Sequence, residues 1–255
     1  MKKLGNDIDT LIEGASIPEE LRIALKRLAQ YVIALMPDLR SDQQFLLTFM
    51  LERLVKDATD ATVDDHWWEV AVDLISKAAS KREDIGLPVS EVVQELISLM
   101  RQRLGTHEEV SFQEITAKTV LGICFLSETL TDPSMKFVAP NAISLAEAHF
   151  NKHAWFRAIY AGRTPVGFVM LDDNEQEEDY FLWRFMIAEP YQGRGYGREA
   201  LRRLVEYVKT RPGAKELSVS CGQGEGSPEG FYLKLGFVHT GQMEGDEVVL
   251  RLPLV

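Results

Sequence analysis

Residues 180–198 read YFLWRFMIAEPYQGRGYGR, and this stretch decides the fold of the second half of the 255-residue chain. The β-branched and aromatic residues of 180–188 predict a strand that runs into Pro190. A glycine-rich loop follows, and an amphipathic helix is predicted over about 196–210. Free N–H groups and the dipole at a helix N-terminus attract an anion, and glycines let a phosphate approach closely. The pattern therefore predicts a phosphate-binding loop.

Other glycine-loop motifs fit this segment less well. In the dinucleotide fingerprint GxGxxG the third glycine comes three residues after the second, whereas Gly197 comes only two residues after Gly195. The GxxxxGK[ST] pattern of a Walker A loop is absent from the sequence. On the loop alone, a tight turn without a ligand stays open as an alternative.

The same segment resembles motif A of the GNAT superfamily of N-acetyltransferases, which is written Q/R-x-x-G-x-G/A. Gln192, Gly195 and Gly197 fill its defined positions. Residues 229–237, EGFYLKLGF, resemble the family's FYxKLGF segment, in which a short helix enters a strand. The two motifs lie in the family's order and at about its separation. The resemblance implies an α+β chain with a GNAT domain over 106–255, built on a mixed, mostly antiparallel twisted sheet flanked by helices.

The resemblance also implies acetyl-CoA as cosubstrate, with no metal. The cosubstrate is expected where strand 180–188 diverges from strand 216–221, with segment 223–234 on the other side. The implied binding residues are Phe185, Met186 and Ile187 along the acyl-pantetheine arm, and Gln192, Gly193, Arg194, Gly195, Tyr196, Gly197 and Arg198 around the pyrophosphate.

Acetyl transfer needs a group that protonates the leaving thiolate and a group that takes a proton from the amine. The resemblance assigns the first role to Tyr232. In many relatives a glutamate on the fourth strand acts as the general base. The matching positions here hold Trp183 and Arg184, and neither can take this role. The alternatives that stay open are a water wire to backbone carbonyls, Glu147, or a histidine such as His149 or His153.

The acceptor class is also implied by resemblance. Residues 111–255 resemble bacterial spermine/spermidine N-acetyltransferases, which implies an enzyme acting on a small primary amine, with a polyamine as the leading expectation. Residues 172–179, DDNEQEED, hold six carboxylates in eight positions and are interpreted as a solvated hairpin loop rather than a cation-attracting rim. The alternatives are another acceptor (antibiotic, amino acid or protein N-terminus) or a CoA-binding regulator with a vestigial transferase domain.

Residues 1–105 are predicted to form an all-α bundle of unknown role, because apolar residues recur at steps of three and four. Ser41 and Asp64 are expected helix caps, and residues 86–90 are expected to separate two helices. Trp67 and Trp68 are interpreted as buried rather than as a binding patch. The expected helices cover 18–36, 42–56, 65–80 and 89–104, and the expected boundary lies at 105–109.

Composition sets the remaining expectations. The net charge of −11 argues against a nucleic-acid partner. Cys124 and Cys221 have no CxxC neighbours and are interpreted as reduced. No apolar run suits a membrane span or a signal peptide, so a cytoplasmic protein without a membrane partner is expected. Many relatives are dimers, so a homodimer is a further expectation.

Overall fold

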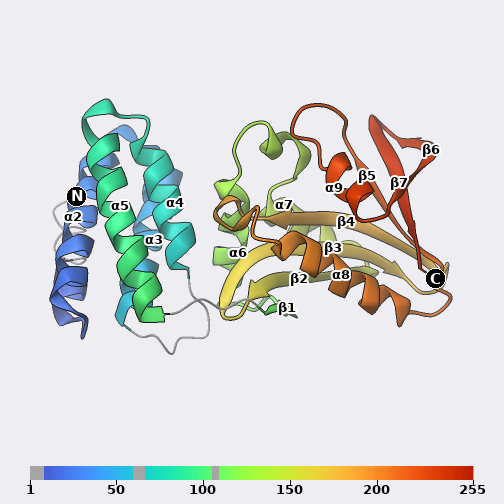
Figure 1. Ribbon diagram of the computed structural model, residues 1–255, viewed down its shortest axis with the longest axis horizontal. Helices are drawn as coiled ribbons and strands as arrows, with labels where there is room; N and C mark the ends of the chain where they lie inside the picture. Colours follow the sequence, from blue (N-terminus) through green and yellow to red (C-terminus); the bar gives the residue numbers. More distant parts are fainter. Residues whose placement is uncertain (1–8, 60–66, 105–108, 255) are drawn as a thin grey trace. The chain divides into compact units, whose positions relative to one another are not determined.

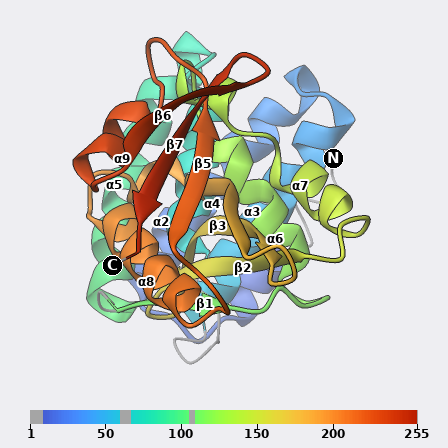
Figure 2. The same cartoon turned by 90° about the vertical axis from the view of Figure 1, so that its right-hand side faces the viewer.

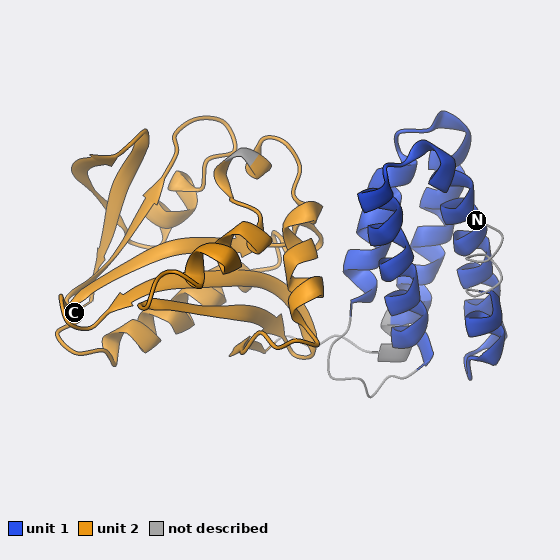
Figure 3. Cartoon of the chain, turned by 180° about the vertical axis from the view of Figure 1, so that it is seen from behind, with its two compact units in different colours: residues 1–107 blue, residues 108–255 orange. Residues whose placement is uncertain are grey.

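The computed structural model describes residues 9–59, 67–104 and 109–254. The chain divides into two compact units, residues 1–107 and 108–255, which are coloured separately in Figure 3. The expected cap Asp64 and most of the expected boundary at 105–109 lie outside the described residues.

The first unit is helical where it is described (Figure 1). Its apolar positions pack inward as the helical spacing predicts, and Leu25, Leu28 and Val32 are 0% exposed. Burial of such side chains stabilises the bundle by about 1.5–3 kcal/mol each. Besides the helical residues 9–14, its helices are α2 (Glu19–Leu35), α3 (Ser41–Thr59), α4 (Trp68–Ala79) and α5 (Glu83–Leu104).

Two predicted boundaries in this unit are wrong. Ser41 is the first residue of α3, and the Gln43 side chain accepts the N–H of Arg40 at 3.1 Å in place of a serine cap. The expected break at 86–90 lies inside α5. Pro88 stands in the second turn of α5, so the backbone hydrogen bond that proline cannot donate is one near the start of the helix.

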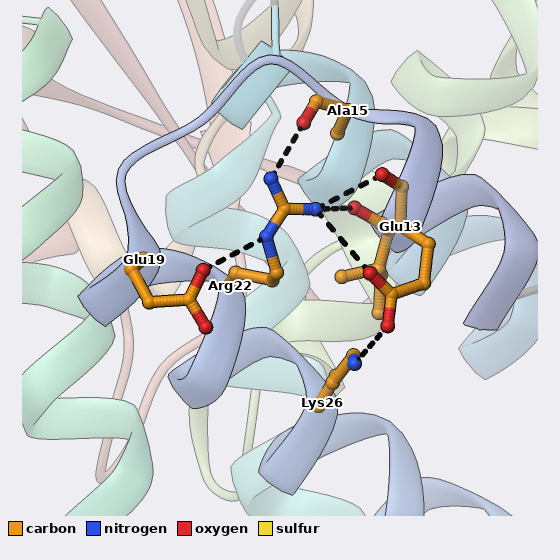
Figure 4. Close-up of polar contacts among 6 residues, drawn as sticks. Glu13, Ala15, Glu19, Arg22 and Lys26 are labelled. Carbon is orange, nitrogen blue, oxygen red and sulfur yellow. Dashed lines mark hydrogen bonds and ion pairs between the residues drawn. The ribbon is translucent and has the colours of Figure 1, made fainter.

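Arg22 joins the start of the chain to α2 (Figure 4). Its guanidinium donates to the carbonyls of Ile12, Glu13 and Ala15 at 2.6, 3.1 and 3.0 Å. Carbonyls at a helix C-terminus lack partners within the helix, so an arginine placed there satisfies them. The side chain also pairs with Glu19 at 3.3 Å.

The two tryptophans of the first unit are buried, as predicted, with Trp67 2% and Trp68 4% exposed. The N–H of Trp67 donates to Asp57 Oδ2, and the Arg53 guanidinium lies 5.9 Å from the Trp67 ring centroid. Asp57 is itself fully buried. Burial raises the pKa of this carboxyl to about 7, and the backbone hydrogen bonds from Trp67 and Trp68 and the charge of Arg53 only partly oppose the shift.

The second unit is built on a seven-stranded sheet in the order β1-β2-β3-β4-β5-β7-β6. The strands β5, β7 and β6 lie side by side at one end of this sheet (Figure 2). Neighbours are antiparallel except for the parallel pair β4 and β5. The α+β fold predicted from the sequence is therefore confirmed. The strands are β1 (Val110–Gln113), β2 (Ala154–Ala161), β3 (Thr164–Asn174), β4 (Asp179–Ile187), β5 (Glu216–Cys221), β6 (Val238–Glu244) and β7 (Glu247–Pro253).

Helices cover both faces of this sheet (Figure 1). They are α6 (Val120–Leu126), α7 (Asn141–Ala148), α8 (Tyr196–Lys209) and α9 (Glu229–Lys234). On β4, Phe185 stacks on Phe231 of α9, while the next residue, Met186, meets Asn141 of α7. Successive strand residues point to opposite faces. Thus α9 and α7 lie on opposite sides of the sheet.

The S-x-x-E spacing of Ser144 and Glu147 is typical of a capping box that opens a helix, but it does not open α7. The helix already begins at Asn141 after Pro140, so both residues lie within it. Ser144 is buried and its hydroxyl donates to the Pro140 carbonyl at 3.4 Å. Glu147 instead reaches Arg184 on β4. Proline at the N-cap position starts the helix one turn earlier than the serine spacing suggests.

Candidate active site

The site begins where β4 and β5 separate. The two strands pair only at Phe181 with Ser218 and at Leu182 with Val219. Directly after these pairs, a bulge at Trp183 shifts the register of β4 against β3. An extra residue bends a strand and turns its neighbours to new faces. The bulge and the end of pairing together open the sheet along 183–187.

The glycine loop lies at the end of β4. Gly193 and Gly195 have φ values of 73° and 88°, a left-handed conformation that other residues adopt only at a cost. Gly195 directly precedes α8, so the loop delivers the free N–H groups of the helix N-terminus. The Gln192 side chain donates to the carbonyl of Ile187 at 2.9 Å and fixes the loop against the strand.

One cavity of about 710 Å³ joins the strand opening to the loop. It brings together most of the residues that the sequence placed around a cosubstrate, namely Phe185, Met186, Ile187, Gln192, Gly193, Gly195, Gly197 and Arg198. Residues of the β5–α9 segment, including Pro228 and Phe231, line it as well. Arg194 and Tyr196 are not among its lining residues, and the Arg194 guanidinium lies 5.4 Å from the Tyr191 ring centroid.

Tyr232 lines the same cavity from α9. Its side chain is 4% exposed and packs against Phe231 and Phe237, with ring centroids 5.4 Å away in both cases. Burial raises the pKa of the Tyr232 phenol, and the nearby Cys221 and Glu247 raise it further. The phenol therefore keeps its proton at physiological pH and is available there as a proton donor.

The bases left open by the sequence do not lie free in this cavity. Glu147 forms an ion pair with Arg184 at 2.9 Å and is absent from the described lining residues. The His149 ring packs edge-on against Phe150 at 5.0 Å. His153 lines a separate cavity of about 400 Å³ together with Asp173.

Sequence reasoning missed Glu247, a half-buried carboxylate at the start of β7 that lines the large cavity. The Ser220 hydroxyl of β5 donates to its Oε2 atom at 2.5 Å. Nothing in the local sequence sets this residue apart, because Glu244 and Asp246 are acidic too. The hairpin register decides which of the three carboxylates reaches the cavity.

The acidic residues 172–179 end β3, form a turn and begin β4, as the hairpin interpretation expects. Asp173 accepts hydrogen bonds from Tyr207 at 2.8 Å and Arg211 at 3.1 Å. Arg211 also pairs with Glu175. These carboxylates do not line the large cavity where it is described, so they form no rim around it.

No cluster of three or more His, Cys, Asp or Glu side chains in the described part of the chain is arranged to hold a metal ion. No helix among the described residues combines the length and the apolar character that a membrane crossing demands.

The sheet order, the parting of the parallel strands and the glycine loop on a helix N-terminus are the features of a GNAT fold. Residues 125–237 match the model of the acetyltransferase (GNAT) family. The second unit is therefore a GNAT domain, an acyl-CoA-dependent N-acetyltransferase, and the fold and enzyme class expected from the sequence are confirmed.

Two Bacillus proteins are similar to this domain. A spermine/spermidine N(1)-acetyltransferase of Bacillus subtilis strain 168 is 26% identical over 113 residues, which cover 41% of this chain and 72% of the relative. A probable spermine N(1)-acetyltransferase of Bacillus subtilis subsp. natto is 25% identical over 113 residues, which again cover 41% of this chain and 72% of the relative.

Solved structures resemble the same part of the chain. An acetyltransferase from Thermus thermophilus has a TM-score of 0.46 and 21% identity, covering 58% of this chain and 99% of its own. The PaiA N-acetyltransferase of Thermoplasma acidophilum in complex with coenzyme A has a TM-score of 0.43 and 14% identity, covering 57% and 99%.

Proposed function

We propose that this protein transfers the acetyl group of acetyl-CoA to a primary amine, and that the acceptor is a polyamine such as spermidine or spermine. The observation that carries the proposal is the single cavity that runs from the glycine loop at α8, past the opening of β4, to the buried phenol of Tyr232. The N–H groups of the loop can bind a pyrophosphate. At the opening, backbone groups of β4 that are not paired with β5 can bind the thioester.

In this arrangement Gln192, Gly193, Gly195, Gly197 and Arg198 hold the pyrophosphate. Phe185, Met186 and Ile187 align the pantetheine arm, and Tyr232 protonates the leaving thiolate. Arg194 and Tyr196 contribute through their backbone N–H groups, because their side chains lie outside the lining. Holding both reactants in one cavity supplies the proximity that direct amine attack on a thioester requires.

The polyamine assignment rests on two supports. The Bacillus relatives are named as spermine/spermidine and spermine N(1)-acetyltransferases. In addition, the cavity carries a carboxylate, Glu247. Of the three cationic side chains in the lining, Arg184 is balanced by Glu147, Arg198 is assigned to the pyrophosphate, and Lys234 ends α9. An acidic group in a partly water-excluded site favours a cationic acceptor.

The test is release of free thiol from acetyl-CoA in the presence of spermidine, spermine, putrescine, aminoglycosides, amino acids or short peptides. We expect turnover with the polyamines and little with the amino acids. Turnover confined to another class of amine would overturn the polyamine assignment and keep the acetyltransferase. Absence of thiol release with every acceptor, by a protein that binds acetyl-CoA, would contradict transferase activity itself.

A further inference from the structure

An aliphatic amine arrives at the enzyme as an ammonium ion, because its pKa lies near that of lysine, about 10.4. It must lose a proton before its nitrogen can attack the thioester. The cavity-facing residues after the β4 bulge begin with Trp183 and Arg184, and neither accepts a proton. The proton therefore leaves either through a water wire or to a base on another element.

The two faces of the sheet carry different chemistry at the opening. Phe185 stacks on α9, the helix that also holds Tyr232. Arg184 points to the opposite face, where it pairs with Glu147 of α7. The proton donor thus stands on the α9 face, and the α7 face is left for the acceptor amine.

Register places Glu247 on the α7 face. Cys221 pairs with Val248 across β5 and β7, so these two residues share a face. Val219, two residues before Cys221, pairs with Leu182 of β4, which shares a face with Tyr180. The Tyr180 hydroxyl donates to the carbonyl of Pro212 just after α8, and Gly197 of α8 lies beside Phe231 of α9, so Cys221 and Val248 are on the face that α8 and α9 cover. Ser220 and Glu247 each precede them by one residue and point the other way. Their 2.5 Å hydrogen bond confirms that they lie together.

Glu247 also has no other carboxylate beside it in the described lining of the cavity. The other titratable and charged side chains among the described lining residues are those of Arg184, Tyr191, Arg198, Cys221, Tyr232 and Lys234. Its charge contributes to the raised pKa values of Tyr232 and Cys221, so it lies near both residues across the opening of the sheet.

We propose that Glu247 receives the ammonium group of the acceptor and takes its proton, on the face of the sheet opposite Tyr232. The inference rests on the proposed acetyl transfer to an amine. The hydrogen bond from Ser220 orients the carboxylate and leaves its other oxygen free for the ammonium. Base and acid then stand on either side of the thioester, so that the amine enters on one face and the thiolate is protonated from the other.

The proton and electron balance of the step is complete. Glu247 takes one proton from R–NH₃⁺, and the lone pair of the neutral amine forms a C–N bond with the thioester carbonyl carbon. The C–S bond breaks, its electron pair leaves on sulfur, and the thiolate takes the phenol proton of Tyr232. Glu247 passes its proton to water and then takes the excess proton from nitrogen, which it also releases to water, and the phenolate regains its proton from water.

The experiment compares Glu247→Gln with Glu244→Gln, a matched change at an exposed position that does not line the cavity. It measures kcat/KM for spermidine and, independently, the Kd of spermidine for the protein saturated with CoA. We expect Glu247→Gln to lower kcat/KM at least about 100-fold, as removal of a general base does, and to raise the Kd severalfold. Glu244→Gln should stay within twofold of the parent in both.

The Glu247→Asp variant retains the carboxylate and should recover part of the activity that Glu247→Gln loses. Turnover and Kd of Glu247→Gln within twofold of the parent would overturn the proposal. A parent that releases no thiol with any amine would contradict the proposed function. The Kd comparison still judges Glu247 in that case, because an unchanged Kd removes its role in receiving the ammonium and a raised Kd supports it.

Discussion

Tyr232 is the proposed proton donor to the leaving thiolate, and its phenol is buried in the wall of the cavity. Tyr232→Phe removes only the hydroxyl and keeps the packing against Phe231 and Phe237. We expect kcat to fall about 100-fold, since general acids contribute at least that much, while the Kd of acetyl-CoA stays within twofold. Steady-state kinetics and calorimetry measure the two quantities. Turnover within a factor of two of the parent would show that Tyr232 is not the acid.

Arg184 and Glu147 allow a second test at this scale, because their ion pair sets the charge beside the opening. Glu147→Gln leaves the Arg184 charge without this partner, so we expect KM for a cationic amine to rise about threefold, with kcat nearly unchanged. The double variant with Arg184→Met should return KM toward the parent value. A large fall in kcat for Glu147→Gln, not reversed in the double variant, would instead identify Glu147 as the base.

The loop between β4 and α8 matters as an element, because its geometry depends on left-handed glycines. Gly195→Ala places a side chain at a φ of 88°, which costs about 1–2 kcal/mol, although nothing lies within 4 Å of the added Cβ. We expect a lower free energy of unfolding and at least about tenfold weaker acetyl-CoA binding, because the loop relieves the strain by moving its N–H groups. Denaturant titration and calorimetry measure both effects.

The matched control is Gly230→Ala. Gly230 lies in α9 and an added Cβ there also meets nothing within 4 Å, but its φ is not in the left-handed region. Alanine in a helix is favoured over glycine by up to about 1 kcal/mol, so this variant should be as stable as the parent or more so. Equal losses in the two variants would show that the left-handed conformation is not what the loop needs.

Elements whose pattern is local were predictable from the sequence, and contacts that depend on register were not. The strand at 216–221 and the helix over about 196–210 match β5 and α8 closely, because alternation and helical spacing reflect burial directly. The start of α7 was missed because Pro140 competes with the serine signal at Ser144. Glu247 was missed because its contact with Ser220 depends on how β7 pairs, after an irregular stretch between His239 and Met243.

The molecule as a whole contains two separate compact units, and a buried acid makes the stability of the first depend on pH. The pKa of Asp57 is about 7 in the folded chain, against an ordinary value of 3.8. Between these values the folded chain holds a proton that the unfolded chain has released. Stability therefore falls as the pH rises from about 4 to 7, by up to about 4 kcal/mol, and changes little from this group above pH 7.

Asp57→Asn removes this titration and keeps an oxygen that can accept the N–H of Trp67. We expect the variant to match the parent near pH 4 and to unfold less readily than the parent at pH 8, with the pH slope removed. Hydrogen exchange of peptides from α3 and α4 measures this local stability, and peptides from the second unit serve as the internal reference. Asp42→Asn, at an exposed position of the same helix, should leave the parent slope unchanged. A slope that survives in Asp57→Asn would mean that another group carries it, and that Asp57 is ionised in the folded bundle despite its burial.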